Sequence, residues 1–165
     1  MSRHQLAQFN LATMKEPLEA PSMADFVANL DRINALAESS PGFVWRLQTE
    51  AGNATALRPL GENRLVNISV WRDVAALEHY VYRSAHVEVM RRRKEWFERL
   101  SEVYLVLWWV PRGHRPGVAE AIERLEHLRR HGPTAHAFGF RSAWPAPDEA
   151  EPAGRLAAGG ECPAT

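Results

Sequence analysis

Residues 104–110 read Tyr-Leu-Val-Leu-Trp-Trp-Val, an unbroken apolar run that is followed at once by a loop over residues 111–116. A short run of β-branched, aromatic and leucine side chains without polar alternation is typical of a strand that is covered on both faces. The sequence therefore predicts a central strand here, in a sheet with apolar layers on both sides.

Three shorter segments upstream also have the character of strands. Apolar side chains alternate with polar ones over residues 5–14, 43–48 and 66–70, as expected for strands with one buried face. The stretch 53–63 contains proline, glycine and asparagine and is interpreted as a hairpin connection. The chain is thus expected to supply four strands by residue 110.

Helices are predicted over residues 22–37, 73–81, 84–100 and 118–131. In the first, Ser22 and Asp25 have the spacing of a capping box, and apolar residues then recur every three or four positions. Asp73 and Ser84 are suitable first residues for the next two helices. A glycine and a proline at 132–133 would end the last one, after which residues 135–140 could add a short strand.

The order βαββαβ with an extra C-terminal helix predicts an α+β fold, the ferredoxin-like plait, in which helices cover one side of an antiparallel sheet. The second side must also be covered, because Phe43, Trp45, Leu107 and Trp109 are too apolar to face water. We therefore expect a homodimer in which sheet packs against sheet.

Length and composition limit the remaining possibilities. With 165 residues, of which 45% are hydrophobic, one folded domain over residues 1–142 is expected, followed by a disordered or loosely attached Pro/Gly/Ala-rich tail at 143–165. The formal net charge is +0, which gives no field to attract nucleic acid or an anionic membrane. A lone Cys162 and a polar N-terminus without an apolar signal region lead us to expect a cytoplasmic protein.

One helical stripe mixes polar and apolar side chains. His86, Met90, Arg93, Phe97 and Leu100 follow a four-three-four-three spacing and so share a helix face. In one interpretation Arg93 pairs with an acidic residue and His86 makes a local hydrogen bond. In the other they form a pocket floor, where His86 acts as acid or base and Arg93 stabilises an oxyanion.

The tryptophans allow two interpretations as well. Trp45, Trp71, Trp96, Trp108 and Trp109 are a heavy aromatic load for one domain. They could form core and dimer contacts, or they could wall a cavity for a flat hydrophobic ligand. In the second case the orienting polar groups would be Asn10 or Asn67 and Tyr80 or Tyr82.

Other histidines are weaker candidates. His114 lies in the loop after the apolar strand, where it could contact a ligand or only fix a turn. His127 and His131 are four apart on a helix but are interpreted as surface residues, since no cysteine or carboxylate completes a metal set. No phosphate-binding glycine loop or nucleophile elbow is recognisable, so cofactor-free chemistry or plain binding is favoured.

Several segments also resemble a known bacterial family. These are residues 84–86, 93–97, 107–111, 113–116 and 130–135. They are similar to a family catalogued as a domain of unknown function within the dimeric α+β barrel superfamily, and the resemblance covers about residues 5–140. Relatives of that family include cofactor-free antibiotic-biosynthesis monooxygenases and, more distantly, haem-binding chlorite dismutases and dye-decolourising peroxidases. The resemblance is specific for fold and says little about the reaction.

Together these observations predict a cofactor-independent enzyme of small-molecule metabolism, and of secondary metabolism in particular. It would carry out oxygenation or acid/base-assisted rearrangement of an aromatic or polyene substrate. His86 and Arg93 would be catalytic, with Met90, Trp96 and Phe97 among the binding residues. The alternative is a non-catalytic ligand-binding or haem-binding dimer in which His86 or His114 anchors the ligand.

Overall fold

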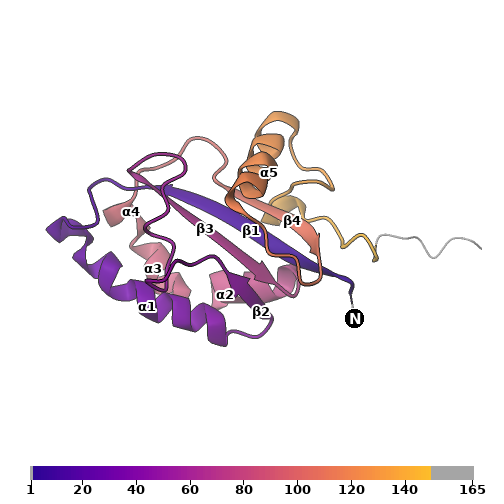
Figure 1. Ribbon diagram of the computed structural model, residues 1–165, viewed down its shortest axis with the longest axis horizontal. Helices are drawn as coiled ribbons and strands as arrows, with labels where there is room; N and C mark the ends of the chain where they lie inside the picture. The colour runs from indigo at the N-terminus through magenta and orange to yellow at the C-terminus, as the bar shows by residue number, and fades with distance from the viewer. Residues whose placement is uncertain (1, 150–165) are drawn as a thin grey trace, which may run out of the picture.

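The computed structural model describes residues 2–149 and contains one four-stranded antiparallel sheet in the order β2-β3-β1-β4 (Figure 1). The strands are β1 (His4–Thr13), β2 (Phe43–Arg46), β3 (Arg64–Trp71) and β4 (Leu105–Pro111). The long strand β1 lies in the middle of the sheet and pairs with β3 on one side and β4 on the other. Alternate residues of β1 therefore define the two faces of the whole domain.

The helices complete the predicted order. They are α1 (Ala24–Ser39), α2 (Val74–Arg83), α3 (His86–Arg91), α4 (Arg93–Trp96) and α5 (Val118–His131), with short 3-10 turns η1 (Pro21–Met23) and η2 (Phe140–Ser142). The chain thus has the ferredoxin-like α+β fold expected from its sequence, with α5 as the extra element. No helix in the described residues is both long enough and apolar enough to cross a membrane.

The apolar run at 104–110 forms a strand, but β4 lies at the edge of the sheet and not at its centre. Within the described residues its free edge has one backbone bridge, where Leu107 and Phe138 exchange hydrogen bonds of 2.8 and 2.9 Å. The strand expected at 135–140 is reduced to this bridge. Both faces of β4 are nevertheless buried, with Leu107 and Trp108 fully inaccessible, which explains why the strand carries no polar alternation.

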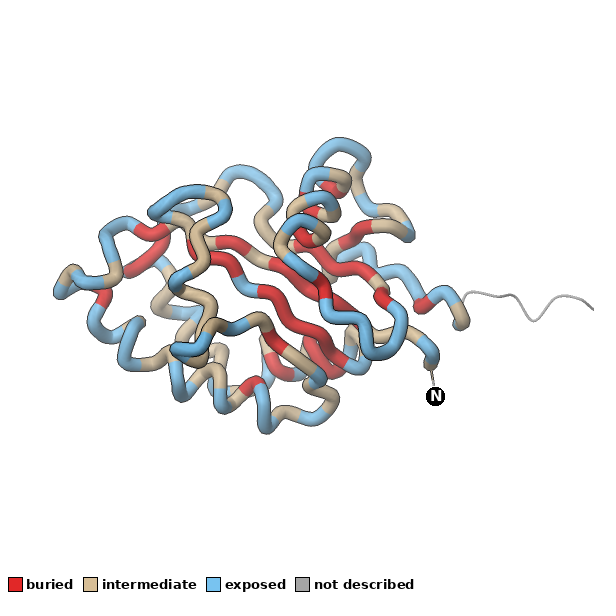
Figure 2. Tube along the Cα trace, in the orientation of Figure 1, coloured by how far each residue is buried: buried red, intermediate tan, exposed pale blue. Residues whose placement is uncertain are grey.

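Helix α5 covers the sheet face opposite α1 and α2. Its Leu125 packs in one cluster with Phe9 and Trp108, and these strand residues are 0% exposed within a single chain. Figure 2 shows buried backbone along the central strands of the sheet. Trp45 and Phe43, whose apolar character suggested a partner, are partly buried: Trp45 packs against this cluster, and Phe43 packs against the cluster beneath α1 and α2. Much of this sheet face is therefore covered within one chain, and the homodimer stays a prediction.

Two local predictions about helix ends have different outcomes. Asp73 caps α2 as expected, with its side chain accepting a 2.8 Å hydrogen bond from the backbone N–H of Ala76. Ser22 does not cap α1, because the 3-10 turn η1 occupies that position and places Met23 at the helix start without a side-chain hydrogen bond.

The helix predicted over residues 84–100 is two short helices, α3 and α4. At Arg92 the backbone has φ −88° and ψ 0°, which lies between helical and turn geometry and changes the chain direction. Phe97 is already extended and pairs its backbone with Met14. Leu100 therefore lies outside the predicted stripe and packs instead with the cluster under α5.

The segment 143–149, which is expected from the sequence to belong to the tail, contacts the folded domain, and the boundary expected at residue 142 stays a prediction. The carboxylate of Asp148 accepts hydrogen bonds from the N-terminal Ser2 and Arg3, and Ala146 is 0% exposed. The backbone carbonyl of Trp144 accepts a 2.8 Å bond from the indole N–H of Trp109. The rest of the expected tail, residues 150–165, lies outside the described residues.

Candidate functional site

A cavity of about 310 Å³ lies between the sheet and the helices α1 to α4. Its floor is the sheet face that α5 does not cover, and its roof comes from α1, from α2 and from the short helices that follow. The volume is at the lower end of the range for small-molecule pockets. Alternate residues of β1 and β3 point into it, because side chains of a strand alternate between faces.

The floor carries a chain of amide and hydroxyl groups. The Gln8 side-chain amide donates to Oδ1 of Asn67 at 2.6 Å and to Oγ of Ser69 at 3.1 Å, and its carbonyl accepts from Asn10 at 2.9 Å. The indole N–H of Trp71 also donates to Ser69, at 2.9 Å. Gln8 is 3% exposed, so this network is fixed by burial and joins two strands into one polar surface.

Four aromatic rings in succession form one wall. Phe43 meets Trp71 edge-on at 5.4 Å between ring centroids, Trp71 stacks on Tyr80 at 5.0 Å, and Tyr80 contacts the His86 ring at 4.8 Å. Burial raises the pKa of Tyr80 well above its ordinary value, and the nearby charge of Arg46 opposes that rise only in part. The phenol is therefore protonated at neutral pH, and its hydroxyl donates to the backbone carbonyl of Ile33 at 3.4 Å.

His86 lies at the end of this aromatic wall, where burial is the main cause that lowers its pKa below 6.5. The charge of Arg93 lowers the pKa further, whereas the backbone carbonyl of Val81 raises it in part. The Nδ1 atom of His86 is buried and has no hydrogen-bond partner at normal distance and angle within the described residues. The imidazole is thus neutral at pH 7 and able to accept a proton.

Arg93 has no acidic partner among residues 2–149. Its guanidinium lies 4.6 Å from the ring centroid of Tyr104 and 5.8 Å from that of Phe97, and one terminal amino group is buried without a hydrogen bond. A buried donor without a partner costs about 1–3 kcal/mol, so this arrangement is expected where a ligand completes the bonding. The ion pair considered as one interpretation of Arg93 is not formed in the described part of the chain.

The neighbouring Arg92 shows the contrast. It pairs with Asp25 of α1 at 2.7 Å and with Glu95 at 2.9 Å, and it stacks over Trp96 at 4.9 Å. These contacts hold α4 against the start of α1. Arg92 therefore pairs with the nearby carboxylates of Asp25 and Glu95 and fixes the position of α4, on which Arg93 lies.

A second arginine lines the cavity from β2. Arg46 donates from Nε to Glu38 at 2.8 Å, and its side chain is only 10% exposed. A β-bulge between Phe43 and Trp45 sets this orientation, since it shifts the register so that Arg46 pairs with Ser69 on the cavity side. No aspartate or glutamate is among the described residues that line the cavity.

Most of the residues predicted for a site lie around this cavity. The lining includes His86, Arg93, Asn10, Asn67, Tyr80, Tyr82, Met90, Trp96 and Phe97. Tyr82 and Met90 are also partly solvent-exposed, with 60% and 38% of their surface accessible, so they lie where the cavity opens.

Three predicted residues lie elsewhere. Trp45 is turned to the α5 side by the bulge, and Trp108 pairs with Ala7 on that same face. His114 is outside the cavity, where its Nε2 lies 2.7 Å from the carboxylate of Glu120. These three are therefore not ligand-binding residues of this cavity.

The sequence interpretation missed several lining residues. Gln8 and Ser69 share the strand alternation of Asn10 and Asn67, so the period of two could have revealed them. Arg46 could not be found in this way, because the bulge reverses the alternation just before it.

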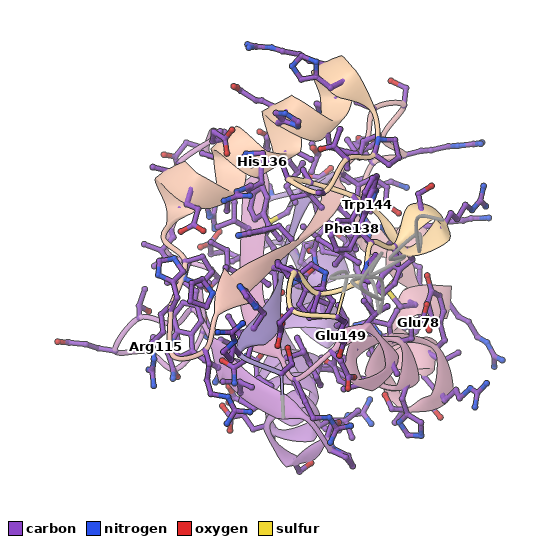
Figure 3. All side chains as sticks on the ribbon, turned by 90° about the vertical axis from the view of Figure 1, so that its right-hand side faces the viewer. Glu78, Arg115, His136, Phe138, Trp144 and Glu149 are labelled. Carbon is purple, nitrogen blue, oxygen red and sulfur yellow. The ribbon has the colours of Figure 1, made fainter. Side chains whose placement is uncertain are left out.

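The histidines of α5 lie on the other side of the molecule. The rings of His127 and His131 are 4.5 Å apart, and His127 also contacts His136, which Figure 3 labels beside α5. Within residues 2–149 no group of three or more histidine, cysteine, aspartate or glutamate side chains is placed to hold a metal ion.

Several solved structures are similar to this chain at low sequence identity. SnoaB, a cofactor-independent oxygenase from Streptomyces nogalater, is 17% identical with a TM-score of 0.45, covering 69% of this chain and 96% of that chain. NE2512, a protein of unknown function from Nitrosomonas europaea, is 14% identical with a TM-score of 0.44, covering 69% and 94%. A dabb family protein with a ferredoxin-like fold from Mesorhizobium loti is 16% identical with a TM-score of 0.41, covering 66% and 99%.

A family model matches more of the chain than these structures do. The family model described as a domain of unknown function, DUF3291, matches residues 5–154. No curated protein matches the chain.

Proposed function

This chain belongs to the DUF3291 family, and we propose that it is a cofactor-independent enzyme that takes a proton from a flat hydrophobic substrate and stabilises the resulting oxyanion. The observation that carries the proposal is Arg93, a guanidinium with a buried amino group and no acidic partner in the described chain, in a cavity that it shares with His86. A cation in such a position can stabilise negative charge that develops on a substrate.

The proposed roles follow from charge and position. His86 is neutral at pH 7 because burial lowers its pKa, so it can accept a proton from a carbon or oxygen acid. Arg93 would hold the enolate or phenolate that forms. The aromatic wall around Trp71 and Tyr80 would hold the rings and exclude water, which strengthens the pairing of Arg93 with that oxyanion.

Two outcomes of that proton transfer are open. In a rearrangement the proton returns to another atom of the substrate. In an oxygenation dioxygen is the oxidant: a ring methylene loses two hydrogens, one oxygen atom forms the new carbonyl group, and the other leaves as water. The substrate supplies the electrons in the second case.

Anthrone tests this function, because it is a flat aromatic ketone with an acidic methylene. We expect the protein to convert anthrone and dioxygen into anthraquinone and water, or to exchange the methylene hydrogens with deuterated water. Replacing His86 with alanine should slow either process by on the order of 100-fold to 10,000-fold. His79→Ala is the matched control, since His79 is exposed on α2 and is not among the residues that line the cavity.

The second candidate is ligand binding without catalysis. It is favoured by the polar floor, where Gln8 already bonds three neighbours and leaves a preformed surface. Anthrone that binds without conversion or exchange would support this candidate and contradict the first. His86 is the only described histidine that lines the cavity, so a Soret band that His86→Ala abolishes would instead indicate bound haem.

A further inference from the structure

Arg46 has bonding capacity that the described chain does not use. Its Nε donates to Glu38, but its two terminal amino groups make no hydrogen bond within residues 2–149. Ninety per cent of the side chain is nevertheless shielded from solvent, because only 10% is exposed. These amino groups are not among the buried side-chain atoms that lack a partner, so they remain accessible where Arg46 lines the cavity. A guanidinium has five N–H donors in a planar fork, and an anionic group can bind those that the described chain leaves free.

Arg46 and Arg93 lie at different levels of the same cavity. Arg46 is opposite Ser69, which in turn is opposite Gln8 of β1. Arg93 stacks over Tyr104, whose carbonyl accepts a bond from Leu11 N–H. Positions 8 and 11 are separated by about 10 Å along a strand.

The wall between the two arginines is aromatic. Arg46 opposes the rise in the pKa of Tyr80, and Arg93 helps to lower the pKa of His86, so each arginine lies near one ring of that contacting pair. Among residues 2–149, no carboxylate lines the cavity to compensate either charge from inside. Glu38, the partner of Arg46, is 47% exposed and lies on the outer side.

We propose that the cavity binds an elongated hydrophobic molecule with an acidic group at each end, one held by Arg93 beside His86 and the other by Arg46. This substrate class rests on the proposed function, since Arg93 and His86 keep the roles given above. Arg46 adds the specificity: it selects a second anionic group at a fixed distance from the reacting end. The rings between the two groups contact Trp71 and Tyr80.

Two probes with the same ring system test the proposal by isothermal titration calorimetry at neutral pH. Naphthoate carries one carboxylate, and naphthalenedicarboxylate carries one at each end. We expect the diacid to bind wild-type protein at least about 10-fold more tightly than the monoacid, because a buried charge pair is gained. Equal affinities would overturn the proposal but leave the proposed function standing, whereas no binding of either probe would contradict both.

Two variants then test which arginine binds which acidic group of the ligand. Arg46→Gln should weaken the diacid far more than naphthoate and so abolish the preference between them, whereas Arg93→Gln should weaken both probes. If Arg46→Gln weakens both probes equally, Arg46 supports the fold only and the proposal fails.

Two further variants guard against a folding defect. Glu38→Gln keeps the arginine and removes its exposed partner, so the preference for the diacid should rise several-fold; a fall would contradict the role of Arg46. Arg72→Gln is the matched control, because Arg72 is 62% exposed in its side chain, pairs with Asp73 and is not among the residues that line the cavity.

Discussion

The two faces of the sheet are built from alternate residues of the same strands and have opposite character. Toward α5, β1 presents Ala7, Phe9 and Leu11, all at most 2% exposed and packed in one apolar cluster. Toward α1 and α2 the same strand presents Gln8 and Asn10, which belong to the polar floor of the cavity. A single strand thus supplies stability on one face and binding groups on the other.

The contrast between the two faces shows where the domain holds polar groups that lack hydrogen-bond partners. The α5 face is stabilised by burial of apolar area, at roughly 25 cal/mol per Å². The cavity face contains Arg93, which has a buried donor without a partner and therefore lowers the stability of the free protein. Sites that hold such groups for a ligand commonly cost stability, so substitutions on the two faces should have different consequences.

The largest effect is expected on the α5 face. Phe9→Ala should lower the free energy of unfolding by about 3–5 kcal/mol, because Phe9 is fully buried and its removal leaves a cavity. Chemical denaturation measures the change, and Phe9→Leu provides a milder variant if the alanine protein does not fold. A loss below about 1 kcal/mol would mean that α5 does not pack on the sheet as described.

A smaller effect concerns pH. The pKa of His86 is lowered in the folded chain, so the unfolded chain binds its proton more readily. The contribution of this group to stability is therefore complete above the ordinary pKa of 6.5 and declines as pH falls below it, by at most about 1.4 kcal/mol per pH unit. Unfolding curves between pH 7 and pH 5 measure the slope.

The matched variants for this pH effect lie on opposite sides of the sheet. His86→Asn should flatten the slope. His127→Asn on α5 removes the other histidine whose pKa is lowered, and there the cause is again loss of solvation together with neighbouring His136 and His131. If only the α5 variant changes the slope, the neutral state assigned to His86 is wrong.

The smallest effect is expected in the polar floor. Gln8→Leu has similar volume but removes the bonds to Asn67, Ser69 and Asn10, so we expect about 1 kcal/mol of lost stability and a clear loss of affinity for naphthoate. Gln48→Leu, at an exposed position after β2, is the control and should change neither. Unchanged naphthoate binding in the Gln8 variant would mean that the polar floor takes no part in ligand binding.

Much of the fold could be predicted from periodicity. Alternation placed β1 within a residue of its observed bounds, and Asp73 marked the start of α2 by its ability to cap a helix. The position of β4 at the edge could not be predicted, because an apolar run reports burial of both faces and not the number of paired neighbours. The role of α5 was missed because its apolar stripe fits a same-chain sheet as well as a partner surface.

The candidate site was predictable where it follows regular geometry. His86 and Met90 follow the predicted helical spacing on α3, and Arg93 also lines the cavity although it begins the separate helix α4. Arg46 depends on a bulge, and the break at Arg92 depends on tertiary contacts with α1, so neither could be found from spacing alone.

Arg93→Met tests the central claim most directly, measured as both the free energy of unfolding and the affinity for naphthoate. A side chain held for a ligand should be replaceable without loss of folding, so we predict unfolding within about 1 kcal/mol of wild type and naphthoate binding weakened by roughly 2–5 kcal/mol. Arg72→Met, on an exposed arginine that is not part of the cavity lining, should change neither quantity. A large loss of stability with unchanged naphthoate affinity would contradict the account, because it would make Arg93 a structural residue.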